Sequence, residues 1–127
     1  GHIRELVSRI NATRRRHPAL QFDHTLRFHD TDNAEIIAYS KRSPDGRDLI
    51  FVVVNLDPVN MQHGFVQLPL VDWGITPHAT VEVADLLSGE RYFWRGEWNY
   101  VRLDPQDRVG HMLHVQLARP LPPADHA

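Results

Sequence analysis

The chain has 127 residues, with 14 lysines and arginines against 16 aspartates and glutamates, a formal net charge of -2 and no cysteine. This length fits one domain that buries about two-thirds of the surface its unfolded chain exposes. The balanced charge argues against nucleic acid, and the missing cysteines exclude disulfides and thiolate metal sites. No apolar run approaches the roughly 20 residues that span a bilayer, and no signal-peptide pattern opens the chain, so we expect a cytoplasmic protein without membrane contact.

An apolar stripe near the amino end predicts a helix within residues 1–17. The stripe has three- and four-residue spacing and consists of Ile3, Leu6, Val7 and Ile10. Pro18 disfavours helical backbone at the preceding residue, so the helix should end near Arg16. The arginines at 14–16 then complement the negative end of the helix dipole, and we prefer this interpretation to a phosphate site.

Short β-like runs with turn signals between them follow Pro18 and predict an antiparallel β-sandwich of about eight strands over residues 18–119. The expected strands are 25–29, 35–41, 49–55, 64–68, 80–86, 91–94, 98–103 and 111–117. The run 50–54 is continuously apolar, as a central strand covered on both faces would be. The tail 120–127 contains three prolines and should be loose.

Two turn sequences predict hairpins. Ser43-Pro44-Asp45-Gly46 has proline and glycine where a tight turn needs them, so strands 35–41 and 49–55 should pair. Ser88-Gly89 predicts the same for strands 80–86 and 91–94.

The segment Glu90–Pro105 reads as a third hairpin, with a three-residue loop centred on Gly96. In that arrangement Trp94 faces Trp98 and Tyr92 faces Tyr100 on one side, while the other side holds Phe93, Val101 and Leu103. An aromatic face of this kind suits stacking on sugar rings, with Arg102 or Glu97 bonding hydroxyls. We favour the alternative, that these aromatics close the sandwich or pack on another domain. The candidate carbohydrate contacts are Tyr92, Trp94, Trp98, Tyr100 and Arg102.

No motif predicts catalysis, a metal or a cofactor. His111 and His114 are three residues apart and should point to opposite faces of a strand, and His29 near a strand end should be solvated. Asp30 and Asp32 form a D-x-D pair, which we interpret as turn residues rather than a cation site. The sequence has no phosphate loop, nucleophile elbow or argued pair of catalytic carboxylates.

Several ordered motifs resemble one enzyme family. These are INATRRRHPALQ, LRFHDTDNAEIIAYSKR, IFVVVNLDP, VADLLSGERYFW and WNYVRLDP. Together they resemble the carboxy-terminal part of bacterial α-1,4-glucan:maltose-1-phosphate maltosyltransferases, which are α-amylase-like enzymes of glycoside hydrolase family 13. The resemblance extends from about residue 3 to residue 115.

The resemblance implies a domain that lacks the catalytic barrel of such an enzyme. The helix within 1–17 would be the last barrel helix, and the β-sandwich would be of the α-amylase C-terminal type. The barrel of the same parent chain would be the main partner, no redox cofactor would be needed, and no catalytic residue carries over. The resembled enzyme transfers maltosyl units from maltose 1-phosphate to an α-1,4-glucan with retention.

Three hypotheses stay open at this point. The domain is a non-catalytic accessory unit that stabilises and packs on the barrel, or a carbohydrate-binding module for α-1,4-glucan. The third is a free-standing protein with an unrelated activity.

Overall fold

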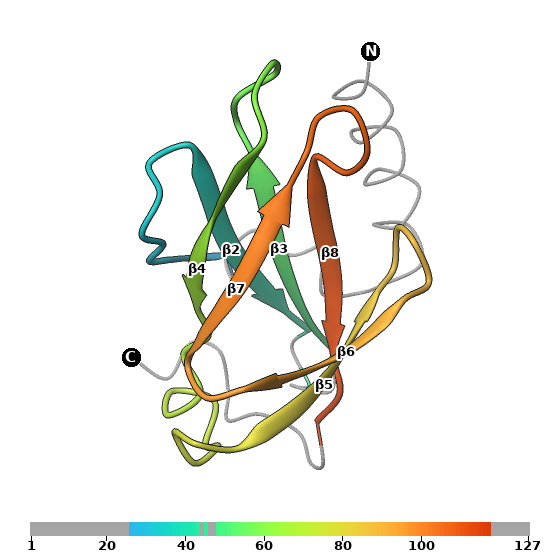
Figure 1. Ribbon diagram of the computed structural model, residues 1–127. Coiled ribbons are helices and arrows are strands. Elements are labelled where there is room, and N and C mark those ends of the chain that lie inside the picture. Colours follow the sequence, from blue (N-terminus) through green and yellow to red (C-terminus); the bar gives the residue numbers. More distant parts are fainter. Residues whose placement is uncertain (1–25, 44, 46–47, 118–127) are drawn as a thin grey trace.

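The computed structural model describes residues 26–43, 45 and 48–117, and within them the chain is an antiparallel β-sandwich (Figure 1). The strands are β1 (Arg27–His29), β2 (Ile36–Arg42), β3 (Leu49–Asn55), β4 (Gln62–Gln67), β5 (Thr80–Asp85), β6 (Arg91–Arg95), β7 (Trp98–Leu103) and β8 (Gly110–Val115). A six-stranded sheet has the order β1-β2-β3-β8-β5-β6, and β4 pairs with β7 in a second sheet. The predicted all-β sandwich is confirmed. The expected helix within 1–17 and the tail 120–127 lie outside the described residues.

The main core lies between the two sheets, and the central strand β3 supplies Phe51 and Val53 to it at 0% exposure. From the second sheet, Val66 of β4 and both Val101 and Leu103 of β7 point inward to meet them. The two-residue period of strands gives β7 its strictly alternating burial. Sheet-on-sheet packing of alternating side chains therefore accounts for this core.

The large sheet is also apolar on its other face. Ile50, Val52 and Met112 form a second buried cluster there, against which other apolar side chains pack. Those partly buried neighbours are Tyr39, Val54, Leu86 and Leu87. A two-layer sandwich requires only one apolar face per sheet, whereas β3 and β8 have apolar residues on both faces. Both faces of these strands are therefore suited to being covered.

Both predicted turn hairpins are confirmed. Strands β2 and β3 pair from Ile36↔Asn55 to Arg42↔Leu49. Strands β5 and β6 pair as well, with Gly89 at φ 81° in the connection, a left-handed conformation that glycine adopts without a steric penalty. Within the described residues, no helix has the length and apolar character of a membrane span.

The third predicted hairpin is wrong. Strands β6 and β7 do not pair with each other, because β6 joins β5 in the large sheet and β7 joins β4 in the small one. The chain passes between the sheets at residues 95–97, which Figure 1 shows as a bend at the lower left, where the chain leaves β6 and turns up into β7. Gly96, at φ 74°, donates its N–H to the carbonyl of Ala79 over 3.0 Å, and the amide of Leu68 donates to the carbonyl of Glu97.

The side chain of Asn99 holds this corner. Its Oδ1 accepts the amide hydrogen of Arg95 at 3.1 Å, and its Nδ2 donates to the carbonyl of Gly96 at 3.0 Å. The corner lets Trp94 of one sheet and Val101 of the other face the same core. The predicted alternation within each strand was correct, while the predicted pairing of the strands was not.

Another polar tie joins the sheets at the end of β3. The buried Asn55 donates from Nδ2 to the carbonyls of Leu103 at 3.0 Å and Asn60 at 3.1 Å. Its Oδ1 accepts the amide hydrogen of Asp57 at 2.8 Å. Hydrogen bonds from the amides of Asn60 and Val59 lower the pKa of Asp57 to about 2. The sequence Asn55-Leu56-Asp57-Pro58 is therefore a structured turn.

Candidate functional site

The outward face of the two-stranded sheet exposes three aromatic rings, which we call the aromatic surface. Phe65 of β4 and Trp98 and Tyr100 of β7 are 44%, 46% and 52% exposed. Phe65 lies directly opposite Tyr100, with ring centroids 5.7 Å apart in an edge-on arrangement. Rings displayed this way on a rigid sheet provide flat, apolar contact area with polar edges.

Polar side chains extend this surface along both strands. His63 lies opposite Arg102, and the His63 ring is 5.8 Å from that of Tyr100. At the other end, Gln67 lies opposite Trp98. The surface therefore combines aromatic faces with hydrogen-bonding groups.

The five candidate residues from the sequence fall into two groups. Trp98, Tyr100 and Arg102 lie on the aromatic surface. Trp94 instead packs against the main core, 6.3 Å from the ring of Phe51, and Tyr92 packs there as well. The expectation of a single shared aromatic face is wrong, because β6 and β7 belong to different sheets.

Phe65 and His63 belong to the same surface, although they are not among the candidates from the sequence. Both come from β4, whose burial alternates around the buried Gly64 and Val66. That alternation would have marked them as outward-facing residues, but only the pairing of β4 with β7 brings them beside Tyr100.

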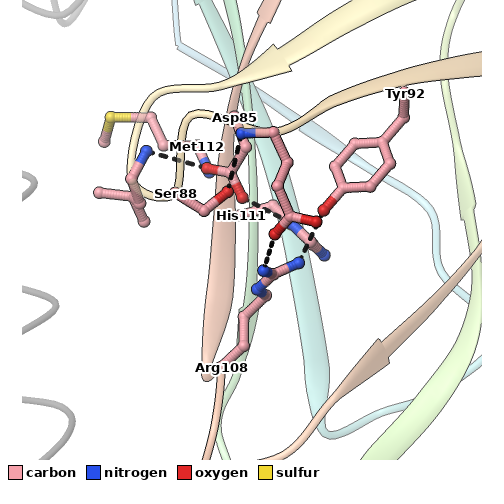
Figure 2. A network of polar contacts seen from close by, with 8 residues as sticks. Asp85, Ser88, Tyr92, Arg108, His111 and Met112 are labelled. Atoms are coloured by element: carbon pink, nitrogen blue, oxygen red, sulfur yellow. Dashed lines mark hydrogen bonds and ion pairs between the residues drawn. The ribbon is translucent and has the colours of Figure 1, made fainter.

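Tyr92 belongs to a polar network at the end of the large sheet (Figure 2). Its hydroxyl accepts a hydrogen bond from Nη1 of Arg108 at 2.7 Å, and Arg108 also forms an ion pair with Glu90. The ring of His111 lies 5.8 Å from that of Tyr92, edge to face. Burial raises the pKa of Tyr92. Among the described residues, no buried side-chain nitrogen or oxygen lacks a partner.

A pocket of about 310 Å³ lies at the Trp98 end of the aromatic surface. Gln67 and Glu97 both line the pocket and connect it to the aromatic surface. Gln67 lies opposite Trp98 in the sheet, and Glu97 directly precedes Trp98 in the chain. Among the described residues, the pocket is lined by Phe28, His29, Asp30, Gln67, Pro69, Val71, Asp72 and Glu97. This volume is at the lower end of the range for small-molecule sites.

His29 forms one wall of the pocket and is not the solvated imidazole that we expected. It stacks on Phe51 with ring centroids 5.4 Å apart, and its Nε2 lies 2.6 Å from Oγ of the buried Ser40. Burial lowers its pKa from 6.5 to about 4, against the opposing charges of Asp72 and Asp30. The ring is therefore neutral near pH 7.

Asp32 of the D-x-D pair is hydrogen-bonded to the backbone of β4. Oδ1 of Asp32 accepts the amide hydrogen of Phe65 at 2.7 Å, and the neighbouring Thr31 forms an isolated bridge with Val66 of β4. The segment around Asp32 thus flanks the small sheet. In the part of the chain that the structure describes, no three His, Asp or Glu residues are grouped to hold a metal ion.

Solved structures with the same fold define the class of domain. A noncanonic maltogenic α-amylase from Thermotoga neapolitana superposes with a TM-score of 0.54 at 14% identity, over 72% of this chain and 20% of that one. A putative α-N-acetylgalactosaminidase from Bacillus halodurans gives 0.50 at 18% identity, over 74% and 20%. The chain is therefore an amylase-like β-sandwich domain.

Sequence comparison identifies the family. The family model described as "GLGE, C-terminal" matches residues 28–115, and the chain belongs to this family. The α-1,4-glucan:maltose-1-phosphate maltosyltransferase 2 of Streptomyces coelicolor is 46% identical over 114 residues, which cover 90% of this chain and 17% of the relative. The enzyme of that name from Cereibacter sphaeroides is 42% identical, with coverages of 85% and 16%. The chain thus spans about a sixth of the length of these relatives.

Proposed function

We propose that this chain is the non-catalytic C-terminal domain of a cytoplasmic maltosyltransferase. The parent enzyme transfers maltosyl units from maltose 1-phosphate to α-1,4-glucans. Support comes from relatives of that name that align with this chain over about a sixth of their length. Residues 1–17 belong in this proposal to the end of a catalytic barrel, and residues 18–119 form the accessory domain.

The domain's role in this proposal is to stabilise the enzyme by packing on the barrel. One observation carries it, the exposed Phe93 of β6 on the second apolar face of the large sheet, where the cluster of Ile50, Val52 and Met112 is itself already buried within the chain. A sheet face of this composition is suited to a further layer of structure. Phe93 points to the same side from β6 and is 74% exposed, so a partner there would remove a large apolar area from water.

The activity is tested on the complete protein encoded by the gene. We expect sequence for a catalytic barrel before Gly1, and release of inorganic phosphate from maltose 1-phosphate when maltoheptaose is the acceptor. A reading frame without a barrel, or a complete protein that releases no phosphate, would refute the proposal. Cell fractionation of the native protein checks the cytoplasmic assignment.

The packing role is tested by two matched substitutions on opposite sides of the sandwich. Phe93→Ser should leave the 127-residue chain as stable as before but should lower the unfolding midpoint of the complete enzyme, since burying a phenylalanine contributes about 1.5–3 kcal/mol. Phe65→Ser, on the aromatic surface, should lower neither midpoint appreciably. An unaffected complete enzyme with Phe93→Ser, or a larger loss with Phe65→Ser, would contradict packing through the large sheet.

A second candidate function is binding of α-1,4-glucan through Trp98, Tyr100 and Arg102. Its support is their exposure on the small sheet, opposite the face assigned above to the barrel. Aromatic rings stack on the C–H faces of sugars, and Arg102 offers donors to hydroxyls. Titration of the chain with maltoheptaose or glycogen, followed by tryptophan fluorescence, should saturate and should weaken in Trp98→Ala. No saturable binding at millimolar ligand would refute this function.

A further inference from the structure

The pocket at the Trp98 end of the aromatic surface is lined by three acidic residues from separate segments. Asp30 follows β1, Asp72 lies in the connection after β4, and Glu97 lies in the corner between β6 and β7. Both Asp30 and Asp72 are exposed, and Glu97 is half-buried. Their main-chain groups hold the local fold, since the carbonyls of Asp30 and Glu97 accept hydrogen bonds from Gln67 and Leu68.

The rest of the lining is apolar or neutral. Phe28 and Val71 are 65% and 59% exposed, and Pro69 also lines the pocket. His29 carries no charge near neutral pH because burial lowers its pKa to about 4. The amide of Gln67 adds both a donor and an acceptor.

This combination fits a polyhydroxyl ligand better than a metal ion. The carboxylates are not part of any metal-holding group among the described residues. Acceptors spread around a pocket match the many O–H donors of a sugar, and apolar walls match its C–H faces. Hydrogen bonds to charged acceptors are also the stronger ones.

We infer that this pocket binds one end of an α-glucan chain, whose following rings extend over Trp98 and Tyr100. The inference rests on the glucan-binding function proposed above and adds a defined end to that surface. Trp98 and Arg102 are four residues apart on one face of β7, a span of about 13 Å at the rise of a β-strand. Gln67 joins the pocket to the surface, since it lines the first and lies opposite Trp98 in the second.

The test measures maltoheptaose binding to the 127-residue chain by calorimetry. The double variant Asp72→Asn with Glu97→Gln should bind at least tenfold more weakly, because two charge-assisted hydrogen bonds become neutral ones. Asp107→Asn, an exposed acid in the β7–β8 connection, is the matched control and should bind like the unchanged chain. Unchanged thermal unfolding of each variant verifies that the fold is retained.

Other outcomes separate this inference from the function on which it rests. Equal binding by the double variant, with loss in Trp98→Ala, would overturn the pocket assignment and leave glucan binding in place. No saturable binding to the unchanged chain would overturn both. A basic peptide such as hexa-arginine is the probe for the competing occupant. Its salt-sensitive binding, lost in the double variant while maltoheptaose binding persists, would assign the pocket to a cationic partner instead.

Discussion

Nδ1 of His111 lies 2.9 Å from Oδ2 of Asp85, and the two side chains are 9% and 1% exposed. Oδ1 of the same carboxylate accepts the amide hydrogens of Leu87 at 3.0 Å and Met112 at 3.4 Å. Burial by itself would raise the pKa of Asp85, but the hydrogen bonds from His111 and the two amides outweigh it and lower the pKa. One carboxylate thus fastens the β5–β6 hairpin to β8, as Figure 2 shows.

Removing this carboxylate should destabilise the domain. In Asp85→Ala, His111 and the amide of Leu87 lose their buried acceptor, and we expect a loss of about 2–4 kcal/mol of unfolding free energy. Asp85→Asn keeps one acceptor oxygen and should lose clearly less. Urea unfolding with an unchanged m-value measures both. A loss below about 1 kcal/mol in Asp85→Ala would show that water replaces the carboxylate.

The stability of the domain should fall as the pH drops from 6.5 to 4, partly because of His29. In this window the unfolded chain, with an ordinary histidine pKa of 6.5, binds a proton that the folded chain, with a pKa of about 4, does not. The His29 contribution is therefore present above pH 6.5 and lost below about 4. Allowing for partial solvent screening, we expect a loss of about 1–3 kcal/mol.

Two substitutions isolate the His29 contribution. His29→Gln should flatten the slope of unfolding free energy against pH between 6.5 and 4, whereas His78→Gln, at an exposed site, should not. Identical slopes in the three proteins would contradict the prediction. The contribution of Asp85 to stability changes in a separate pH range. Because its pKa is lowered in the folded chain, this contribution is present above the ordinary carboxyl pKa of 3.8 and is lost as the pH falls below that value.

A side chain at position 64 would collide with Asp32, so Gly64 leaves room for that carboxylate. A Cβ at this position would lie 2.3 Å from Oδ1 of Asp32, the atom that accepts the amide hydrogen of Phe65. Gly64→Ala should therefore displace the carboxylate and reduce stability by about 1–2 kcal/mol. The double-mutant cycle with Asp32→Ala measures the coupling, and Gly64→Ala should be much less harmful in that background. Additive effects would place the cause elsewhere.

Three aromatic residues of β6 and β7 should differ in their effect on stability. Trp94→Ala removes a ring that packs against Phe51, and we expect a loss of about 2–4 kcal/mol. Trp98→Ala and Tyr100→Ala remove exposed rings and should each change stability by less than about 1 kcal/mol. Chemical denaturation of the three variants checks this order. A large loss from Trp98→Ala would make that ring a structural element and would weaken the case for a binding surface.

Much of the fold follows from local patterns. The alternation of apolar and polar residues locates all eight strands to within a few residues, and the turn residues around Pro44 and Ser88 fix two hairpins. The continuous apolar run 50–54 correctly predicts a strand buried on both faces. These patterns are visible in the sequence because strand period and turn geometry depend on neighbours along the chain.

The candidate site depends on partners far apart in the sequence. The two-residue period of strands assigns each residue from Tyr92 to Tyr100 to one of two strand faces. No local pattern, however, shows that the chain leaves one sheet for the other at Gly96. That change depends on the pairing of β7 with β4 and on the bonds of Gly96 with Ala79 and Asn99. The sequence by itself therefore determined the strands, the turns and the family resemblance. Only the tertiary structure decided that Trp94 is core and Trp98 is surface, because that choice is made by packing between two sheets.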